Sequence, residues 1–323
     1  MGSFPASLRG SLEAAIADCH LSLTGKTILT EAATGPYVGT PILAAMADAK
    51  HVFAYTKSGP YGSIEDVRDR TLTLAQLCGV AERISIVSSL NEEIVQRADI
   101  ITNSGHLRPI DHRKIAWFKD GAVVPLMYEA WEFRDSDVDL EACRKRNIAV
   151  AGTNETHPAV NVFSFLGPMA ILLLENAGLI VRGAHILLLC DNPFKPFLLK
   201  ALTAAGAKVD LCQEIPLEGP AYQAVVVALT PKPTDVLSIE DLEQLASLWP
   251  KALVARFWGD LDNEAMANAK LRFYPQHVDR GHMGILPSAL GFEPIVRLQC
   301  GGLKVGQILS DGGTGDCGFV QRL

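Results

Sequence analysis

Residues 183–213 decide the fold, and they read GAHILLLCDNPFKPFLLKALTAAGAKVDLCQ. The apolar run that ends at Cys190 predicts a buried strand. The apolar residues around 197–202 predict a helix, and 207–211 predict a second short strand. A strand, a helix and a second strand in this order make a β-α-β unit with parallel strands.

The loop inside this unit, at 191–196, contains no glycine. A dinucleotide-binding fold carries a G-x-G-x-x-G fingerprint at this turn, because backbone N–H groups must approach the pyrophosphate closely. Here the turn holds Asp191, Asn192, two prolines and Phe194. The sequence therefore indicates the scaffold of a cofactor-binding unit whose loop no longer suits a dinucleotide.

Strands and helices alternate along most of the chain, which predicts parallel sheets with helices on both faces. We expect two Rossmann-like doubly wound α/β domains, at 1–152 and 153–290. The remainder, 291–323, is expected to be a C-terminal β segment with a mobile tail. Residues 295–309 are predicted to form a β-hairpin or a returning strand, followed by a mobile stretch at 310–318. The other predicted strands are 26–30, 51–55, 84–87, 99–103, 122–127, 147–151, 224–229, 252–257 and 271–274. The other predicted helices are 7–19, 41–49, 63–77, 91–97, 111–117, 157–177, 239–248 and 263–270.

Composition narrows the possible functions. The chain has 323 residues and a formal net charge of −7, which argues against nucleic acid and acidic membranes as main partners. Its seven cysteines include no CxxC pair and no Cys/His cluster with metal spacing, so we expect no metal site and a reduced, cytoplasmic protein. The apolar runs are too short to span a bilayer.

Three loops of the first domain are the candidate ligand-binding sites, because the carboxyl ends of parallel strands meet at one rim. The loop at 57–63 carries a cation, hydroxyls and glycines before a helix, which suits a carboxylate or phosphate. In each loop an ordinary turn that needs glycine for its geometry is the alternative. The candidate residues in these loops are Gly35, Tyr37, Lys57, Tyr61, His106 and Arg108.

Two carboxylates follow the fifth predicted strand at the same rim. Glu129 and Glu132 flank Trp131. Such carboxylates would contact a substrate amine or act as a general acid or base. A solvated acidic turn is the alternative. His157 and His185 are interpreted as structural residues.

Residues 137–150, DVDLEACRKRNIAV, lead into the predicted helix at 157–177. They resemble the D-x-D-x-x-A-C-x-x-R-G-I-x-V run of the NAD-dependent D-2-hydroxyacid dehydrogenase family. VVVALTPKPT at 225–234 is similar to that family's V-V-x-x-x-L-T-P-x-T segment. The ordered resemblance covers 137–280. It implies the two-domain fold and, in the simplest case, an oxidoreductase that uses NAD or NADP.

The chain departs from the family at the positions of the family's catalytic and cofactor-binding residues. The family's catalytic arginine falls on Trp258, and tryptophan cannot orient a 2-oxo acid by a bidentate pair. Arg256 lies two residues earlier, on the same face of an extended strand. His277 matches the catalytic histidine with one residue inserted, and Gln213 falls near the ribose-binding acid. If the chain is an enzyme, its candidate catalytic residues are Arg256, His277 and Glu129.

Phe194, Phe197 and Trp258 would make an apolar surface where the family's cofactor lies, and core packing is the alternative. The missing cofactor loop is similar to that of the dimeric, dehydrogenase-like peptide-binding proteins of crocagin biosynthesis, a ribosomal peptide natural-product pathway. This resemblance implies a homodimeric pseudoenzyme without a cofactor, which presents a peptide or small-molecule substrate to partner enzymes. Glycine-rich strands such as 298–305 would leave an edge open for an extended peptide.

Overall fold

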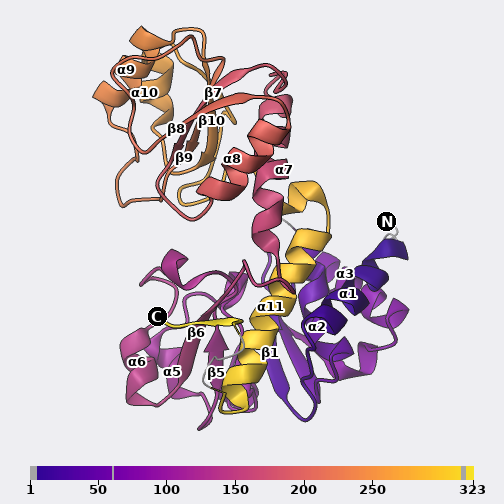
Figure 1. Ribbon diagram of the computed structural model, residues 1–323. Coiled ribbons are helices and arrows are strands. Elements are labelled where there is room, and N and C mark those ends of the chain that lie inside the picture. Colours follow the sequence, from indigo (N-terminus) through magenta and orange to yellow (C-terminus); the bar gives the residue numbers. More distant parts are fainter. Residues whose placement is uncertain (1–5, 60–61, 314–317) are drawn as a thin grey trace. The chain divides into compact units, whose positions relative to one another are not determined.

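The computed structural model describes residues 6–59, 62–313 and 318–323, and the chain divides into two compact units (Figure 1). The first unit is Met1–Val162 together with Gly291–Leu323, and the second is Phe163–Leu290. Within the described residues, every helix is too short or too polar to cross a lipid bilayer.

The first unit is built on a seven-stranded sheet with the order β12-β6-β5-β4-β1-β2-β3. All neighbouring strands are parallel except β12, which pairs antiparallel with β6. The order reverses between β1 and β4, and this switch point is where open α/β sheets bind ligands. The strands are β1 (Thr27–Glu31), β2 (His51–Tyr55), β3 (Ile84–Val87), β4 (Ile100–Ile101), β5 (Val123–Pro125), β6 (Ala149–Thr153) and β12 (Val320–Gln321).

Helices cover both faces of this sheet. Successive side chains of β1 point to opposite faces, so that Ile28 lies in one hydrophobic core and Leu29 in the other. The first core contains residues of α1, α2 and α11, and the second contains residues of α5 and α6. The helices of the unit are α1 (Ala6–Asp18), α2 (Gly39–Met46), α3 (Ile64–Leu77), α4 (Glu92–Val95), α5 (His112–Ala116), α6 (Leu140–Lys145) and α11 (Glu293–Ser310).

Residues 295–309 lie in the helix α11, so the predicted β-hairpin or returning strand is wrong, and so is the open edge at 298–305 (Figure 1). The glycines of this segment are on the helix face that packs against the sheet. A Cβ atom at Gly306 would lie 2.7 Å from a methyl carbon of Ile100, and one at Gly301 would lie 2.9 Å from Val160. Glycine is therefore required by a close approach of helix to sheet, which an isolated sequence pattern cannot distinguish from a weak strand.

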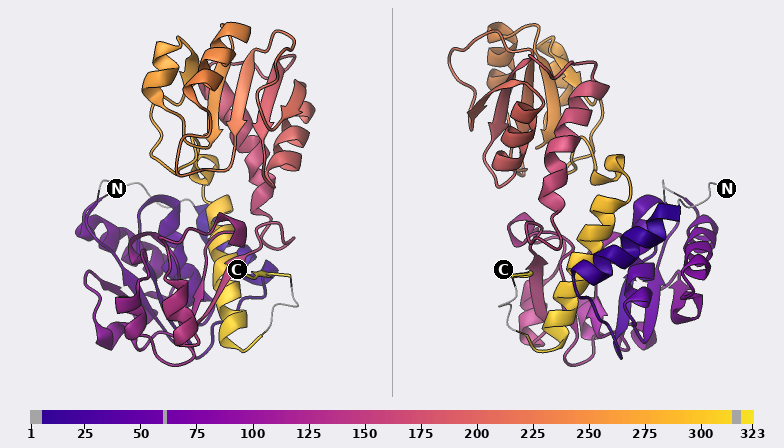
Figure 2. Two further views of the ribbon diagram at one scale, coloured as in Figure 1. Left: turned by 90° about the vertical axis from the view of Figure 1, so that its left-hand side faces the viewer. Right: turned by 45° about the vertical axis from the view of Figure 1, so that its right-hand side comes forward.

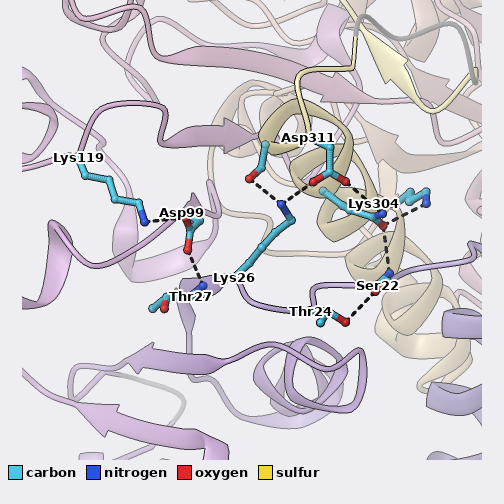
Figure 3. Close-up of polar contacts among 10 residues, drawn as sticks. Ser22, Thr24, Lys26, Thr27, Asp99, Lys119, Lys304 and Asp311 are labelled. Atoms are coloured by element: carbon cyan, nitrogen blue, oxygen red, sulfur yellow. Dashed lines mark hydrogen bonds and ion pairs between the residues drawn. The ribbon is translucent and has the colours of Figure 1, made fainter.

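The last turn of α11 is fastened at the amino ends of the strands. Lys26 directly precedes β1, and its ammonium lies 2.6 Å from the Asp311 carboxylate and 3.0 Å from the Ser310 hydroxyl. Figure 3 shows Lys26 pointing towards Asp311. The backbone N–H of Ser22 donates to the side chain of Gln307 at 3.1 Å. These contacts hold the helix at the end of the sheet opposite to the carboxyl rim.

The predicted tail at 310–318 is only partly within the described residues, since 314–317 lie outside them. Ser310 ends α11, and the N–H of Gly313 donates to the carbonyl of Ile308 at 2.9 Å. The observed C-terminal β segment is the short strand β12.

The second unit holds a five-stranded parallel sheet with the order β11-β10-β9-β7-β8. Its switch point lies between β7 and β9. The helices α7 and α8 pack side by side, as Figure 2 shows. The elements are β7 (His185–Cys190), β8 (Lys208–Cys212), β9 (Ala224–Ala228), β10 (Leu253–Trp258), β11 (Arg272–Tyr274), α7 (Leu166–Asn176), α8 (Lys195–Ala204), α9 (Ile239–Leu248) and α10 (Asn263–Asn268).

The long helix expected at 157–177 begins later than predicted. After β6 the chain makes turns in which Asn161 has a positive φ of 47°, and a 3-10 turn at Val162–Phe165 leads into α7. The left-handed conformation of Asn161 interrupts any helix at this point, because a helix needs a negative φ at each residue. Pro158 therefore belongs to a loop and does not start the helix.

The close packing of α11 predicts an unusual response to alanine. Gly306→Ala should lower the free energy of unfolding by about 1–3 kcal/mol, because the methyl group meets Ile100 and Pro125. In α1, a Cβ atom at Gly10 meets nothing within 4 Å, so Gly10→Ala should raise the free energy of unfolding by about 0.5–1 kcal/mol. Urea denaturation of both variants measures this, and equal stabilisation by the two substitutions would contradict the packing.

Candidate functional site

Three loops meet at the carboxyl rim of the first sheet, as the sequence predicts. A Cβ atom at Gly62 would lie 3.3 Å from Thr34, which joins the loops after β2 and β1. One at Gly59 would lie 4.0 Å from the His106 ring, which joins the loops after β2 and β4. The loops after β1, β2 and β4 therefore form one polar surface at the switch point.

Glu31 is the centre of this surface. It ends β1, and its carboxylate accepts a hydrogen bond from the backbone N–H of His106 at 3.2 Å. The ring nitrogen Nε2 of His106 lies 4.0 Å from the same oxygen. A Cβ atom at Gly105, where φ is +38°, would fall 1.9 Å from the carboxylate oxygens, so glycine makes this approach possible. Burial raises the pKa of Glu31, and the N–H and charge of His106 oppose that rise.

A second group of polar side chains extends from β4 towards β5. Asn103 donates through Nδ2 to the Tyr128 hydroxyl at 2.8 Å, and that hydroxyl donates to Asp137 at 2.7 Å. Arg108 and Arg134 lie 3.6 and 3.2 Å from the same carboxylate. The side-chain oxygen Oδ1 of Asn103 is buried without a hydrogen-bond partner among the described residues. The network thus leaves one buried acceptor that a ligand donor would satisfy.

The acidic turn after β5 is ordered by hydrogen bonds. Glu129 is buried and accepts from the N–H of Glu155 at 2.8 Å and from the indole N–H of Trp131 at 2.7 Å. Burial and the charge of Glu129 raise the pKa of Glu132 to about 8. Burial, followed by the charges of Glu132 and Glu129, raises the pKa of Glu155 well above its ordinary value. The turn is therefore a group of interacting carboxyls and differs from the solvated turn that was the alternative.

The structure brings most of the sequence-predicted rim residues together. His106 and Arg108 lie in the loop after β4, and Tyr37 is close enough to Glu31 for that charge to raise its pKa, after burial. Lys57 is exposed, with its ammonium 5.6 Å from the centre of the Tyr55 ring. Gly35 has a φ of +61° and open space beside it. The predicted residue Tyr61 lies outside the described residues.

Sequence reasoning missed several residues that order this rim. Glu31 ends β1, and Tyr128 and Glu155 come soon after β5 and β6, so polar residues at strand ends were the signal that would have found these three. Asp137 begins the run 137–150 that resembles the dehydrogenase family, but that resemblance gives it no place at the rim. Glu31 and Glu155 bond to groups more than 25 residues away in the sequence. The missed residues are Glu31, Tyr128, Asp137 and Glu155, while Asn103 is the first residue of the predicted loop that holds His106 and Arg108.

The corresponding rim of the second unit is bridged by its own side chains. After β7, Asp191 accepts hydrogen bonds from the N–H and the hydroxyl of Thr230, at 2.8 and 2.9 Å. Asn192 is buried and donates to the carbonyl of Ala228 at 2.8 Å. Thr230 follows β9, so these bonds cross the switch point between β7 and β9.

The first amides of α8 are also engaged. The N–H of Phe194 donates to the side-chain oxygen of Asn192 at 3.1 Å, and that of Lys195 donates to the Asn192 carbonyl at 3.2 Å. Pro196 has no N–H, and that of Phe197 donates to the carbonyl of Phe194 at 3.1 Å. A pyrophosphate needs free N–H groups at this helix start and no competing carboxylate. These residues therefore do not fit a dinucleotide bound in the usual way.

The aromatic residues expected to line a surface are packed together. Phe194 and Trp258 are only 4% and 8% exposed, and their rings lie 5.0 Å apart. Phe163 contacts the rings of both Phe194 and Phe197, each at 5.3 Å. Phe197 remains partly exposed. The expected exposure is thus corrected for Phe194 and Trp258, because their rings fill the space beside the bridged loop.

Arg256 and His277, the candidate catalytic residues of this unit, lie in different surroundings. The buried guanidinium of Arg256 donates to the Asn263 side chain at 2.6 Å and to the carbonyls of Leu261 and Pro275 at 3.3 Å. Its Nη groups therefore hold the loops around β10 together. His277 is exposed. Across the described ranges, no group of three or more His, Cys, Asp and Glu side chains is arranged to hold a metal ion.

Comparison with known proteins gives the fold. No protein-family model matches the chain. No curated protein matches it in sequence. Among solved structures it is similar to the A chain of dipicolinate synthase from Bacillus subtilis, with a TM-score of 0.57 and 11% identity over 90% of this chain and 98% of that one.

Two further similar structures are the same dipicolinate synthase chain from Bacillus halodurans and the pyruvate reductase of Chlamydomonas reinhardtii. The first has a TM-score of 0.54 and 12% identity over 86% of this chain and 96% of that one. The second has a TM-score of 0.52 and 12% identity over 93% of this chain and 98% of that one. The predicted dehydrogenase-like α/β fold with parallel sheets is confirmed, and identities this low show the fold alone.

The raised pKa of Glu132 predicts a loss of stability as the pH rises. Between its ordinary value of 4.5 and about 8, the folded protein keeps a proton that the unfolded chain has lost. The free energy of unfolding should then fall with pH, by up to about 1.4 kcal/mol per unit. Glu132→Gln should reduce this slope between pH 5 and 8, and the raised pKa of Glu155 should keep part of it, as measured by urea denaturation.

The matched control is Glu141→Gln, which changes an exposed carboxylate on α6. It should follow the wild-type curve. If all three proteins lose the same stability over this range, the carboxyl group of Glu132 is not held protonated.

Proposed function

We propose that this protein is a non-catalytic member of the dehydrogenase-like fold. It binds a peptide or small-molecule substrate and presents it to partner enzymes of peptide natural-product biosynthesis. The binding surface is the carboxyl rim of the first sheet. The candidate ligand-binding residues at this rim are Gly35, Tyr37, Lys57, His106 and Arg108, joined by Glu31.

The observation that carries the proposal is the bridged switch point of the second unit. Asp191 places a carboxylate where a pyrophosphate would need a neutral or cationic surface, and its two bonds to Thr230 cross the site. A dinucleotide would have to break these bonds and bring two more negative charges beside Asp191. The second unit therefore lacks the usual contacts that hold the dinucleotide cofactor of a hydride transfer. This favours a binding role over catalysis.

The rim of the first sheet offers a cation and several hydrogen-bonding groups to a ligand. Arg108 is a cationic donor that suits a carboxylate, and the ring of His106 carries a further polar group beside it. The carboxyl groups of the acidic turn are hydrogen-bonding groups, since burial raises the pKa values of Glu132 and Glu155 and the oxygens of Glu129 already accept from Glu155 and Trp131. The unpartnered side-chain oxygen Oδ1 of Asn103 adds a buried acceptor. A peptide carries partners for all of these groups, and a neutral apolar molecule carries none of them.

The proposed biosynthetic pathway and partner enzymes rest on the resemblance to the peptide-binding proteins of crocagin biosynthesis. A homodimer is proposed on the same ground and because closed two-fold dimers are the commonest oligomers. Size-exclusion chromatography with light scattering checks the dimer.

The second candidate function is an NAD- or NADP-dependent oxidoreductase of the 2-hydroxyacid dehydrogenase type. The fold shared with a pyruvate reductase favours it. It would use Arg256, His277 and Glu129. Against it, the Nη groups of Arg256 are occupied by Asn263, Leu261 and Pro275.

One thermal-shift series separates the two functions. NAD, NADH, NADP and NADPH should give no saturable rise in Tm up to millimolar concentration, because a ligand at a hundred times its Kd adds about 2.7 kcal/mol and would be visible. A saturable rise with any of the four contradicts the non-catalytic proposal.

The binding proposal is tested with peptides selected from a synthetic library. Arg108→Ala should weaken a selected peptide about tenfold or more, since a hydrogen bond to a charged group contributes about 1.5–3 kcal/mol. Arg113→Ala, on an exposed position of α5, is the matched control and should leave the Kd unchanged. Failure to select any peptide, or equal Kd values for the two variants, removes the rim as the binding surface.

A further inference from the structure

The outer edge of β6 is occupied by the chain's own final segment. β12 pairs antiparallel with β6, with Val320 opposite Thr153 and Gln321 opposite Gly152. Just beyond this pairing, the N–H of Asn154 donates to the carbonyl of Phe319 at 2.8 Å. An edge strand of a parallel sheet would otherwise present unpaired backbone groups at this place.

Two side chains anchor the segment. The ring of Phe319 stacks on His157, with centroids 3.8 Å apart and planes at 26°, and Lys304 lies 6.0 Å from the same ring. The side-chain oxygen of Gln321 accepts a hydrogen bond from the backbone N–H of Ala130 at 2.8 Å. Ala130 belongs to the acidic turn after β5, so the final segment borders the candidate site.

The pairing covers only part of β6. On the outer side of 149–151, no strand among the described residues is paired. A groove of about 110 Å³ lies beside this part of the edge. It is lined by Leu140, Cys143, Arg144, Ile148, Val150 and Leu323. The edge therefore has room for a longer extended chain than the one that occupies it.

We propose that Gly318–Leu323 is a displaceable occupant of a peptide-binding edge. An extended peptide takes its place by pairing antiparallel with β6, and the segment leaves. Addition of a strand to a sheet edge gives affinity through main-chain hydrogen bonds, and side-chain pockets give selectivity. The matching peptide carries an aromatic residue for the ring of His157 and a side-chain acceptor two residues later for Ala130.

The short register of β12 is the reason to expect exchange. Displacement breaks a ladder of two paired residues and the two hydrogen bonds from Asn154, and it uncovers the buried ring of Phe319. An incoming peptide with an aromatic residue at that position restores the same contacts. A strand that only protects the edge from aggregation has no need to leave. The two roles differ in one measurable property, which is competition between the segment and a free peptide.

The natural occupant of this edge rests on the proposed function: it is a substrate peptide, which would lie beside the acidic turn when it pairs with β6. The exchange itself does not depend on that function. The experiment uses the protein's own sequence as the probe, so its failure leaves the thermal-shift series with cofactors and the peptide-binding test of Arg108 unaffected.

The probe is a fluorescent synthetic peptide, Gly-Phe-Val-Gln-Arg-Leu, measured by fluorescence anisotropy against the full chain and a variant ending at Gly313. A tethered segment competes at an effective concentration of the order of millimolar. The shortened variant should therefore bind the probe at least about tenfold more tightly than the full chain does. Equal binding, or no binding by a shortened variant that circular dichroism shows to be folded, overturns the proposal.

Full-length variants keep the test valid if the shortened chain does not fold. Gln321→Ala removes the bond to Ala130 and should give the probe an affinity above that of the wild type. The matched control, Leu217→Ala, changes an exposed side chain of the second unit and should leave probe affinity unchanged. A probe with alanine in place of phenylalanine should lose its binding. Gln321→Ala with wild-type affinity, or an alanine probe that binds equally well, counts against a displaceable segment.

Discussion

The hydrogen bonds of Asp191 and Asn192 determine what the second unit can bind. They join the loop after β7 to Thr230 and to the last carbonyl of β9, and the start of α8 satisfies its own amides on Asn192. A parallel sheet normally leaves its switch point open for a ligand. In this unit the protein's own side chains form hydrogen bonds across the switch point, and Phe194 packs against Trp258 beside this loop.

In the first unit, the carboxyl rim of the sheet carries polar side chains, and the long helix α11 is fastened at the opposite end of the sheet. α11 packs on one face of the sheet through glycines, and its end is tied to Lys26 at the amino ends of the strands. The rim is then left to Glu31, to Arg108 and to the acidic turn. These polar groups belong to the first unit, whereas the bridged loop at 191–196 belongs to the second.

Sequence patterns correctly predicted the elements whose formation depends on residues that are close together in the sequence. The strand at 51–55 and the helix predicted at 63–77 were found, and in the structure Ser63 and Asp66 form a reciprocal capping box at the start of that helix. α11 was missed because Gly301 and Gly306 read as a weak strand, whereas their reason is contact with Val160 and Ile100 in distant parts of the chain. The convergence of the rim loops followed from parallel strand order. The hydrogen bonds of Asn103, Tyr128 and Asp137 did not, because they join residues that only the folded chain brings together.

The most direct test of the bridged switch point is amide hydrogen exchange of the second unit, followed by NMR. The N–H groups of Phe194, Lys195 and Thr230 donate to Asn192 and Asp191 and should be protected from exchange. Their protection and chemical shifts should stay the same when NADH is added to millimolar concentration. Rapid exchange of these amides, or shifts that saturate with NADH, would show that the site is open to a dinucleotide and would contradict this account.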